Sequence, residues 1–157
     1  MEKIIIEGNH TLTGTIKISG AKNSAVALVP ASLLAEDTVT IDNIPNISDI
    51  NALNEILEYL GAKVKRESET MIIDPSTVKN IAIPENHAKK LRASYYFMGA
   101  LLGKYKKAEM YFPGGCSIGA RPIDLHLKGF EALGAKITTE GDKYIIEADE
   151  LIGTNIY

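Results

Sequence analysis

The sequence predicts an α/β (α+β) protein in which one small unit of helices and strands occurs twice. The first observation is an internal repeat: "LGAKVKRESETMIID" (60–74) aligns without gaps with "LGAKITTEGDKYIIE" (133–147), an offset of 73 residues. The second is that runs with helical spacing of apolar residues alternate with short β-rich runs in both copies. The third is an ordinary globular composition, with 45% hydrophobic and 24% charged residues. Repeats of this kind bury a face against one another, which predicts a shared core.

The first copy is predicted to contain a helix, a strand and a second helix. Small and apolar residues occur nearly all round 22–35, which predicts a buried helix. The run "TVTI" at 38–41 is typical of a short strand. Apolar residues recur at helical spacing through 49–60, with Ser48 as the expected N-cap and Gly61 as the expected residue after the helix.

A hairpin closes each copy, and the second copy repeats the order of the first. In the first copy, 62–66 and 70–74 are the expected hairpin strands. In the second copy, Pro122 is expected in the first turn of a capped helix and Gly134 directly after that helix. The expected elements of the second copy are a buried helix at 88–103, a strand at 108–112, the capped helix at 122–133, and hairpin strands at 135–139 and 143–148.

Both ends of the chain carry strand-like runs outside the repeat. Two leading strands are expected at 3–7 and 14–19, and the last residues, 153–157, also have a strand-like pattern. Because no copy of the repeat surrounds these runs, both ends resemble severed connections to other structure.

The composition excludes several classes of protein. A net charge of −3 gives no basic field for nucleic acid. The single cysteine cannot form an internal disulfide, and the first residues lack the pattern of a signal peptide. The apolar run at 24–35 is broken by Pro30 and too short to span a bilayer. We therefore expect a soluble, cytoplasmic protein that binds neither nucleic acid nor membrane.

The only cysteine lies in a loop built like an anion-binding site. In "PGGCSIGARP" (113–122), glycines 114, 115 and 119 free the backbone for positive φ and for close approach to a ligand. The predicted helix after the loop favours anions at its N-terminus, and Arg121 adds a bidentate donor. Cys116 in this setting is expected to favour the thiolate. The alternative is that Cys116 only fills a small apolar gap.

Two further basic residues occupy positions related by the repeat. Lys22, followed by Asn23, begins the first buried helix, and Arg92 begins its counterpart in the second copy. Each alone is typical of a solvated helix start, but together with Arg121 they predict convergence on one polyanionic ligand. His10 and His87 have no partners at metal-ligand spacing, so neither a metal nor a cofactor is expected.

Four stretches carry a resemblance to a known family. "GAKNSA", "LLAEDTVTIDNIPNISDI", "LRASYYFMGALLG" and "FPGGCSIGARPIDLHLKGFEALGAKI" closely resemble UDP-N-acetylglucosamine enolpyruvyl transferases, the MurA family. The resemblance runs over essentially the whole chain, and the string from Pro113 to His126 is highly specific. The related 5-enolpyruvylshikimate-3-phosphate synthases share the repeat and the early lysine but lack this cysteine loop.

The resemblance implies a reaction and roles for individual residues. The family transfers the enolpyruvyl group of phosphoenolpyruvate to the 3′-hydroxyl of UDP-N-acetylglucosamine, the first committed step towards peptidoglycan precursors, through a tetrahedral intermediate. Cys116 matches the cysteine that protonates the vinyl carbon, forms a covalent adduct and is alkylated by fosfomycin. Lys22 and Asn23 match residues on the phosphoenolpyruvate side. The residues matching the anion and UDP-sugar side are Arg92, Arg121, Pro122, Ile123, Asp124 and Leu125.

The resemblance also implies that the chain is an incomplete part of the fold. The family fold has two halves, each made of three repeated βαβαββ units around buried helices, like an inside-out α/β barrel. On that basis 1–21 are leading strands of the other half, and 22–87 and 88–157 are two of three repeats. The rest of the protein would supply the aspartate that deprotonates the sugar hydroxyl, so we expect no significant turnover by this chain alone. The alternatives are a non-catalytic UDP-sugar-binding fragment and a shikimate-pathway relative.

Overall fold

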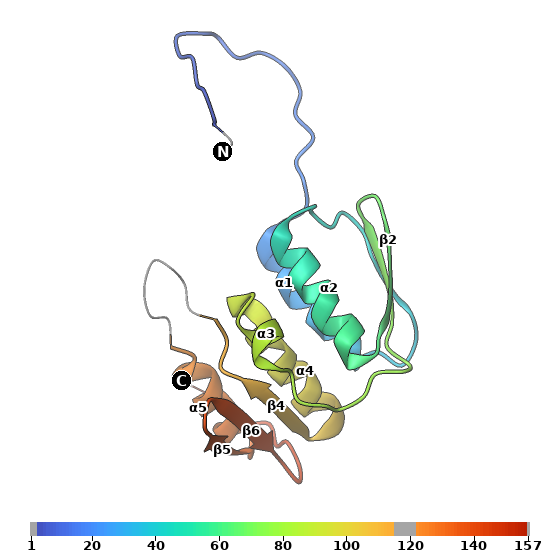
Figure 1. Ribbon diagram of the computed structural model, residues 1–157, viewed down its shortest axis with the longest axis vertical. Helices are drawn as coiled ribbons and strands as arrows, with labels where there is room; N and C mark the ends of the chain where they lie inside the picture. The colour runs from blue at the N-terminus through green and yellow to red at the C-terminus, as the bar shows by residue number, and fades with distance from the viewer. Residues whose placement is uncertain (1–2, 115–121, 157) are drawn as a thin grey trace.

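The computed structural model describes residues 3–114 and 122–156, and contains two units that each have a helical segment, a strand, a second helix and a β-hairpin in that order (Figure 1). The first unit consists of α1 (Lys22–Ala31), the 3-10 helix η1 (Ser32–Leu34), β1 (Val39–Ile41), α2 (Ser48–Leu60), β2 (Lys63–Glu67) and β3 (Thr70–Asp74). The second unit consists of α3 (Glu85–Ala88), η2 (Arg92–Tyr95), α4 (Tyr96–Tyr105), β4 (Lys107–Tyr111), α5 (Asp124–Ala132), β5 (Lys136–Glu140) and β6 (Lys143–Glu147).

Each unit has its own three-stranded antiparallel sheet, and the two sheets have equivalent strand orders. The orders are β1-β3-β2 and β4-β6-β5. Val64 pairs with Ile73 in the first hairpin, and Ile137 pairs with Ile146 in the second. These two pairs are related by the offset of 73 residues. The repeat seen in the sequence is therefore a repeat of strand register, and both predicted hairpins are confirmed.

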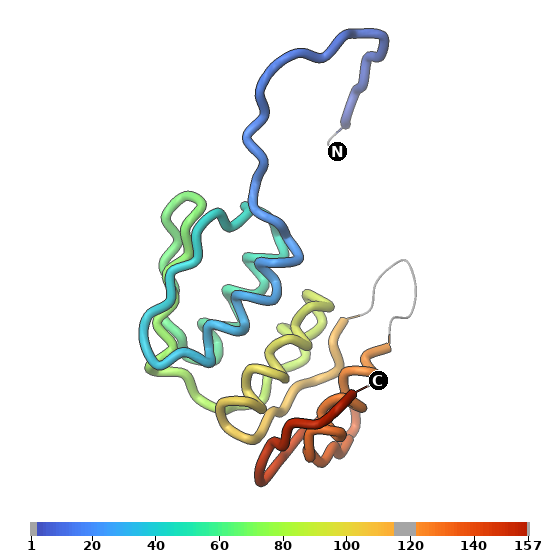
Figure 2. The backbone as a smooth tube through the Cα atoms, turned by 180° about the vertical axis from the view of Figure 1, so that it is seen from behind, coloured from blue at the N-terminus to red at the C-terminus, as the bar shows by residue number. Residues whose placement is uncertain are grey.

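Helices α1, α2 and α4 lie between the two sheets and form the core (Figures 1 and 2). Helix α1 packs against α2 within its own unit and against α4 of the second unit. Apolar side chains from all three helices fill this region, which makes it one core rather than two. The fully buried residues include Val29, Leu33, Ile50, Leu53, Leu57, Phe97 and Leu101.

Polar contacts also join the two units. The Lys104 ammonium donates hydrogen bonds to the carbonyl oxygens of Leu33, at 2.7 Å, and Ala35, at 3.1 Å. These carbonyls end the helical segment formed by α1 and η1, where a cation is favourable. The Tyr105 hydroxyl donates to the Val78 carbonyl at 3.1 Å. The C-terminal end of α4 is thus fixed to the first unit on two sides.

The equivalent helices α2 and α5 differ in how far they are covered. Helix α2 has five buried residues, whereas α5 has none. Leu125 on α5 is 74% exposed, and Phe130 is half-buried against the core. Helix α2 lies between α1 and α3, while α5 rests mainly on its own hairpin. Sequence periodicity alone did not predict this difference, because the difference depends on neighbouring elements.

The expected leading strands do not form. Residues 3–19 have no regular structure in the described chain, and Ile4, Ile5, Ile6, Ile16 and Ile18 are 82–90% exposed. A strand needs a partner for its backbone N–H and C=O groups, and no described segment pairs with this one. The strand expected at the C-terminal end is also absent from residues 151–156.

Both expected buried helices are shorter or more broken than predicted. The first helix changes to 3-10 geometry after Ala31, because Pro30 cannot donate a helical hydrogen bond. It is also open on one side, since Leu28 and Leu34 are both 52% exposed. The second begins at Arg92 rather than at 88, because Leu91 is extended, with φ of −142°, and separates α3 from η2. The Ser94 hydroxyl secures the break by donating to the Ala88 carbonyl.

The two predicted helix starts are wrong and the two predicted glycine ends are confirmed. Ser48 is the first residue of α2, whose N-cap position is Ile47, with no side-chain capping bond. Pro122 precedes α5, whose N-cap is Ile123. Gly61 and Gly134 follow α2 and α5 with φ of 99° and 100°. The residue after each helix has a left-handed backbone conformation that favours glycine, so its identity is readable from the sequence. The contacts of a capping side chain can be replaced by others, so its position is less predictable.

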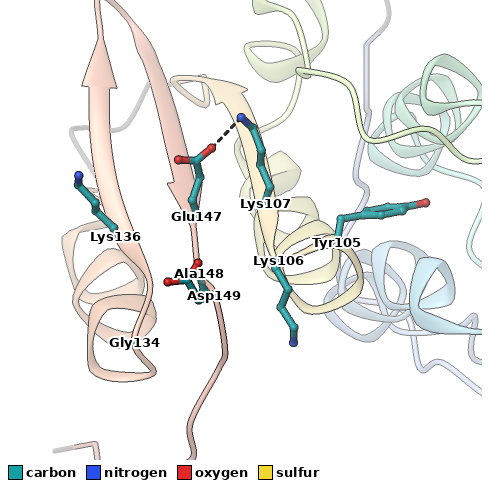
Figure 3. Close-up of a pocket in the computed structure, with 8 residues that line it drawn as sticks. All are labelled: Tyr105, Lys106, Lys107, Gly134, Lys136, Glu147, Ala148 and Asp149. Atoms are coloured by element: carbon teal, nitrogen blue, oxygen red, sulfur yellow. Dashed lines mark ion pairs between the residues drawn. The ribbon is translucent and has the colours of Figure 1, made fainter.

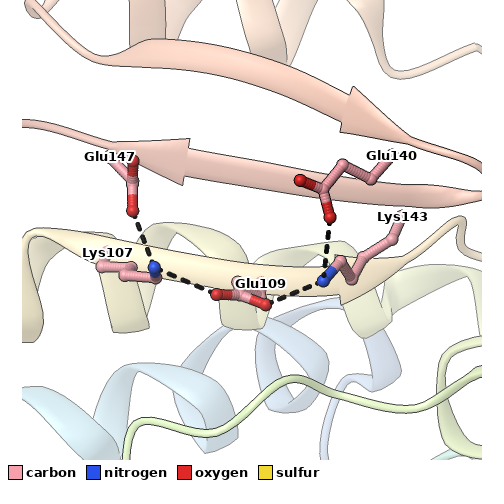
Figure 4. Close-up of polar contacts among 5 residues, drawn as sticks. All are labelled: Lys107, Glu109, Glu140, Lys143 and Glu147. Atoms are coloured by element: carbon pink, nitrogen blue, oxygen red, sulfur yellow. Dashed lines mark hydrogen bonds and ion pairs between the residues drawn. The ribbon is translucent and has the colours of Figure 1, made fainter.

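A chain of ion pairs crosses the three-stranded sheet of the second unit (Figure 4). Glu109 lies between the ammonium groups of Lys107, at 3.1 Å, and Lys143, at 3.0 Å. Glu147 and Glu140 extend the chain at its two ends. The hydrogen bond from Lys143, followed by that from Lys107, lowers the pKa of Glu109.

Replacing Glu109 with glutamine is expected to reduce the acid sensitivity of folding. A carboxyl with a lowered folded pKa stabilises the protein above its unfolded pKa, and that contribution is lost as the pH falls through the folded pKa. Solvent screening keeps the effect at pH 7 below about 1 kcal/mol. Urea unfolding at pH 7 and pH 3 should show a smaller change for Glu109→Gln than for the original chain. Glu140→Gln, at the exposed end of the network, is the control, and equal pH dependence in all three proteins would contradict the prediction.

Candidate functional site

Three of the predicted site residues begin helical elements. Lys22 is the first residue of α1, Arg92 of η2 and Asp124 of α5. The N-terminal ends of α1, α2 and α4 face the same edge of the molecule in both views (Figures 1 and 2). Cys116 and Arg121 lie outside the described residues.

Lys22 is held at this edge by an acidic partner on the neighbouring helix. Its ammonium group forms an ion pair with the carboxylate of Asp49, in the first turn of α2. The Lys22 side chain remains 56% exposed, and Asn23 beside it is also exposed. The sequence offered one signal for this pair, an acidic residue in a helix first turn, but did not indicate which cation it would meet.

The start of α1 is fixed by a close approach at Gly20. A Cβ atom on Gly20 would lie only 1.6 Å from the Asn43 carbonyl oxygen. The loop between β1 and α2 therefore presses directly on the backbone that leads into Lys22. Glycine is required here because no side chain fits between the two backbones.

Arg92 lies at a small pocket beside the start of α5. The pocket has a volume of about 150 Å³. Phe112 and Tyr144 form part of its wall, with ring centroids 4.4 Å apart. The lining residues are Arg92, Phe112, Pro113, Gly114, Pro122, Ile123 and Tyr144. A guanidinium beside apolar and aromatic walls can bind an anion that carries a flat or apolar group.

Gly114 has a different role from the one expected. Its φ is not positive, and its N–H donates to the Ala88 carbonyl at 3.1 Å rather than being free for a ligand. A Cβ atom on Gly114 would lie 2.2 Å from the Lys89 carbonyl oxygen. This glycine fixes the end of the β4 segment against the connection between α3 and η2.

The structure brings together only some of the predicted site residues. Pro122 and Ile123 line the pocket with Arg92, whereas Asp124 and Leu125 are exposed on the first turn of α5 and are not among its lining residues. Ile123 makes no side-chain cap for α5, and the His126 N–H of the first turn donates instead to the Ile123 carbonyl at 2.9 Å. The convergence of Lys22, Arg92 and Arg121 on one ligand stays a prediction.

A second pocket lies at the other end of β4 (Figure 3). It has a volume of about 520 Å³ and lies between the starts of β4 and β5 and the end of β6. Lys107 is paired with Glu147 at 2.7 Å, and the side chains of Lys106 and Lys136 point away from one another (Figure 3). The lining residues are Tyr105, Lys106, Lys107, Gly134, Lys136, Glu147, Ala148 and Asp149. The charges here do not converge, so this pocket is not the candidate site.

Two classes of feature are absent from the part of the chain that the structure describes. No group of three histidine, cysteine or acidic side chains is arranged to hold a metal ion within residues 3–114 and 122–156. In the same residues, no helix has both the length and the apolar character needed to cross a membrane.

Sequence comparison places the chain in a family. The model of the EPSP synthase (3-phosphoshikimate 1-carboxyvinyltransferase) family matches residues 6–157. The chain belongs to this family. Within the family, it is 54% identical over 158 aligned residues to UDP-N-acetylglucosamine 1-carboxyvinyltransferase 2 of Bacillus cereus (strain ZK / E33L). It is 53% identical to the protein of the same name from Listeria monocytogenes serovar 1/2a (strain EGD-e). These alignments cover 100% and 99% of this chain but only 37% of each relative.

Solved structures of the family show the same fold. The enolpyruvyl transferase NikO from Streptomyces tendae matches 90% of this chain and 31% of its own, with a TM-score of 0.75 and 25% identity. EPSP synthase from Acinetobacter baumannii matches 92% of this chain and 34% of its own, with a TM-score of 0.64 and 16% identity. The predicted fold class, repeated α/β units of the enolpyruvyl transferase type, is confirmed.

Proposed function

We propose that this chain is part of an enzyme that transfers the enolpyruvyl group of phosphoenolpyruvate to the 3′-hydroxyl of UDP-N-acetylglucosamine. The observation that carries the proposal is 54% identity across the whole chain to a protein named for that reaction. The cysteine loop supports it, because the shikimate-pathway branch of the family lacks that loop. The proposed setting is the cytoplasm, at the first committed step of peptidoglycan precursor synthesis.

In the proposed reaction, Cys116 is the proton donor to the vinyl carbon and forms the covalent adduct. General acid catalysis needs a donor within reach of the reacting carbon, and a thiol in a glycine-rich loop meets that need. Lys22 and Asn23 bind phosphoenolpyruvate. The ion pair with Asp49 supports this role, because it holds the Lys22 ammonium group at the edge where α1 and α2 begin.

The proposed UDP-sugar side of the site contains Arg92 and the segment from Arg121 to Leu125. Their donors neutralise the diphosphate, and arginine suits that task because its planar guanidinium binds two oxygens at once. The pocket shared by Arg92, Pro122 and Ile123 supports this assignment. Its apolar wall suits the uncharged part of a nucleotide sugar.

The proposed active site is completed by residues outside this chain, which spans 37% of the length of the curated relatives. In this proposal, 22–87 and 88–157 are two of three repeats in one half, and 1–21 contribute strands to the other half. The exposure of Ile4, Ile5 and Ile6 supports the last assignment, since apolar side chains in an extended segment favour pairing with a sheet.

Fosfomycin labelling tests the proposal. The chain is incubated with the epoxide, with and without UDP-N-acetylglucosamine, and its intact mass is measured over time. We expect addition of one inhibitor mass at Cys116, faster by about tenfold with the sugar nucleotide because binding orders the groups around the thiol. Shikimate 3-phosphate at the same concentration is the control and should not accelerate the reaction. Labelling that ignores the UDP-sugar, or that responds to shikimate 3-phosphate instead, would refute the proposal.

A further inference from the structure

Tyr95 makes contacts in three directions at the edge where the candidate site lies. The Arg92 guanidinium carbon is 5.6 Å from the centre of its ring. The Tyr96 ring stacks on it, with centroids 4.7 Å apart and planes 25° apart. The His126 ring contacts it from α5, with centroids 4.5 Å apart and planes 55° apart. One half-buried tyrosine therefore touches both the arginine of the pocket and the first turn of α5.

The contact with His126 matters because α5 has few anchors. No residue within α5 is buried, although Ile123 just before it is. His126 lies on Tyr95, and Phe130 lies beside Gly99 of α4, where a Cβ atom would be 3.8 Å from the Phe130 ring. His126 and Phe130 are four residues apart on α5. Tyr95 and Gly99 are four residues apart along η2 and α4, which follow one another directly, so the two contacts form one stripe on each helical segment. Tyr95 is the member of this stripe nearest the pocket.

We propose that Tyr95 is a positioning residue that holds Arg92 and the first turn of α5 in one arrangement for binding of the UDP-sugar. This inference rests on the proposed function, because it assigns the pocket to that ligand. Arg92 binds the anion directly, and Pro122 and Ile123 line the same pocket. Tyr95 is not among the lining residues, but it contacts Arg92 of the pocket and His126 of α5, so its removal lets Arg92 and the start of α5 move independently.

The physical basis of the contacts with Arg92 and His126 is aromatic packing and cation–π attraction. Aromatic pairs prefer offset and tilted arrangements, as seen here, and a guanidinium is attracted to the face of a tyrosine ring. Burial, followed by the Tyr96 hydroxyl, raises the pKa of Tyr95, which keeps the ring neutral. Because the ring supplies the contacts, phenylalanine should replace tyrosine here, whereas leucine should not.

Binding of UDP-N-acetylglucosamine to the 157-residue chain is measured by titration calorimetry for Tyr95→Leu and Tyr95→Phe. We expect Tyr95→Leu to weaken binding about tenfold and Tyr95→Phe to stay within about twofold of the original chain. The matched control is Tyr59→Leu, which removes a similar tyrosine–histidine contact with His87 in the first unit. Equal losses for Tyr59→Leu and Tyr95→Leu, or a full loss for Tyr95→Phe, would overturn the inference.

A measurement without ligand separates this inference from the proposed function. The ring-proton resonances of His126 and the Nε–H resonance of Arg92 are followed by NMR, with melting temperatures as a check on folding. Tyr95→Leu should shift both sets of resonances, Tyr95→Phe should preserve them, and Tyr59→Leu should shift only those of His87. His126→Ala, which removes an exposed side chain, should shift the Arg92 signal slightly. If the original chain binds no UDP-sugar, the proposed function fails, while unchanged Arg92 and His126 signals in Tyr95→Leu would refute the positioning role itself.

Discussion

Replacing Cys116 with serine is expected to abolish covalent addition of fosfomycin. The thiolate is a strong nucleophile near neutral pH, whereas a serine hydroxyl needs an adjacent general base to react. Because Cys116 is the only cysteine, the original chain offers one candidate position for thiol alkylation. Intact mass after incubation with fosfomycin and UDP-N-acetylglucosamine should therefore show no adduct in Cys116→Ser.

The same variant should keep its affinity for the sugar nucleotide within about twofold, because a serine preserves the size of the side chain and the proposed binding groups lie elsewhere. Calorimetric titration of both proteins checks this, and equal far-UV circular dichroism spectra control for folding. Adduct formation that persists in Cys116→Ser would place the reactive group elsewhere and remove the case for a catalytic thiol. Loss of sugar binding together with the adduct would mean that Cys116 acts in binding, and would contradict the assigned role.

Local sequence signals predicted the parts of the fold that depend on nearby residues. The two hairpins follow from alternating patterns, and the ends of α2 and α5 follow from glycines that adopt positive φ. The offset of 73 residues extends to individual hydrogen bonds. The Lys79 N–H donates to the Leu60 carbonyl in the first unit, and the Ile152 N–H donates to the Leu133 carbonyl in the second, each at 2.8 Å.

Features that depend on a distant partner were predicted less well. The break before η2 depends on Leu91 and on the Ser94 hydroxyl, neither of which interrupts the helical pattern of the sequence. Residues 3–19 have strong strand character, yet no described segment pairs with them. Lys22 and Arg92 were identified as basic residues at helix starts. Asp49 lies on a different helix from Lys22, so spacing in the sequence could not identify that pair. Tyr95 is three residues after Arg92 in η2, but the spacing does not show that its ring also contacts His126 of α5.

Replacing Gly61 with alanine is expected to destabilise the protein more than the same change at the equivalent Gly134. Both glycines have positive φ, which costs a residue with a Cβ atom about 1–2 kcal/mol. They differ in the space available. A Cβ atom on Gly61 would lie 2.7 Å from the Thr77 carbonyl oxygen, whereas one on Gly134 would lie 3.2 Å from the equivalent oxygen of Glu150.

The first unit cannot relieve this contact easily. The Thr77 hydroxyl donates to the Gly61 carbonyl at 2.7 Å. The residue whose carbonyl oxygen would meet the added Cβ atom is therefore itself hydrogen-bonded to Gly61 and cannot move away freely. The bond from Lys79 to Leu60 has an equivalent in the second unit, from Ile152 to Leu133, so the Thr77 hydrogen bond is what distinguishes the first unit. We therefore expect crowding to add about 1–3 kcal/mol to the conformational cost at Gly61. At Gly134 a shift of a few tenths of an ångström is enough to relieve the contact.

Asparagine separates the two causes, because it tolerates positive φ but still carries a Cβ atom. Urea unfolding should show that Gly134→Asn is close to neutral, whereas Gly61→Asn loses nearly as much free energy of unfolding as Gly61→Ala. Gly129→Ala is the control within α5, the helix that Gly134 follows. Nothing lies within 4 Å of its added Cβ atom, so it should gain about 0.5–1 kcal/mol. If Gly61→Asn were neutral as well, the cost at Gly61 would come from φ alone, and the contact with Thr77 would have no energetic weight.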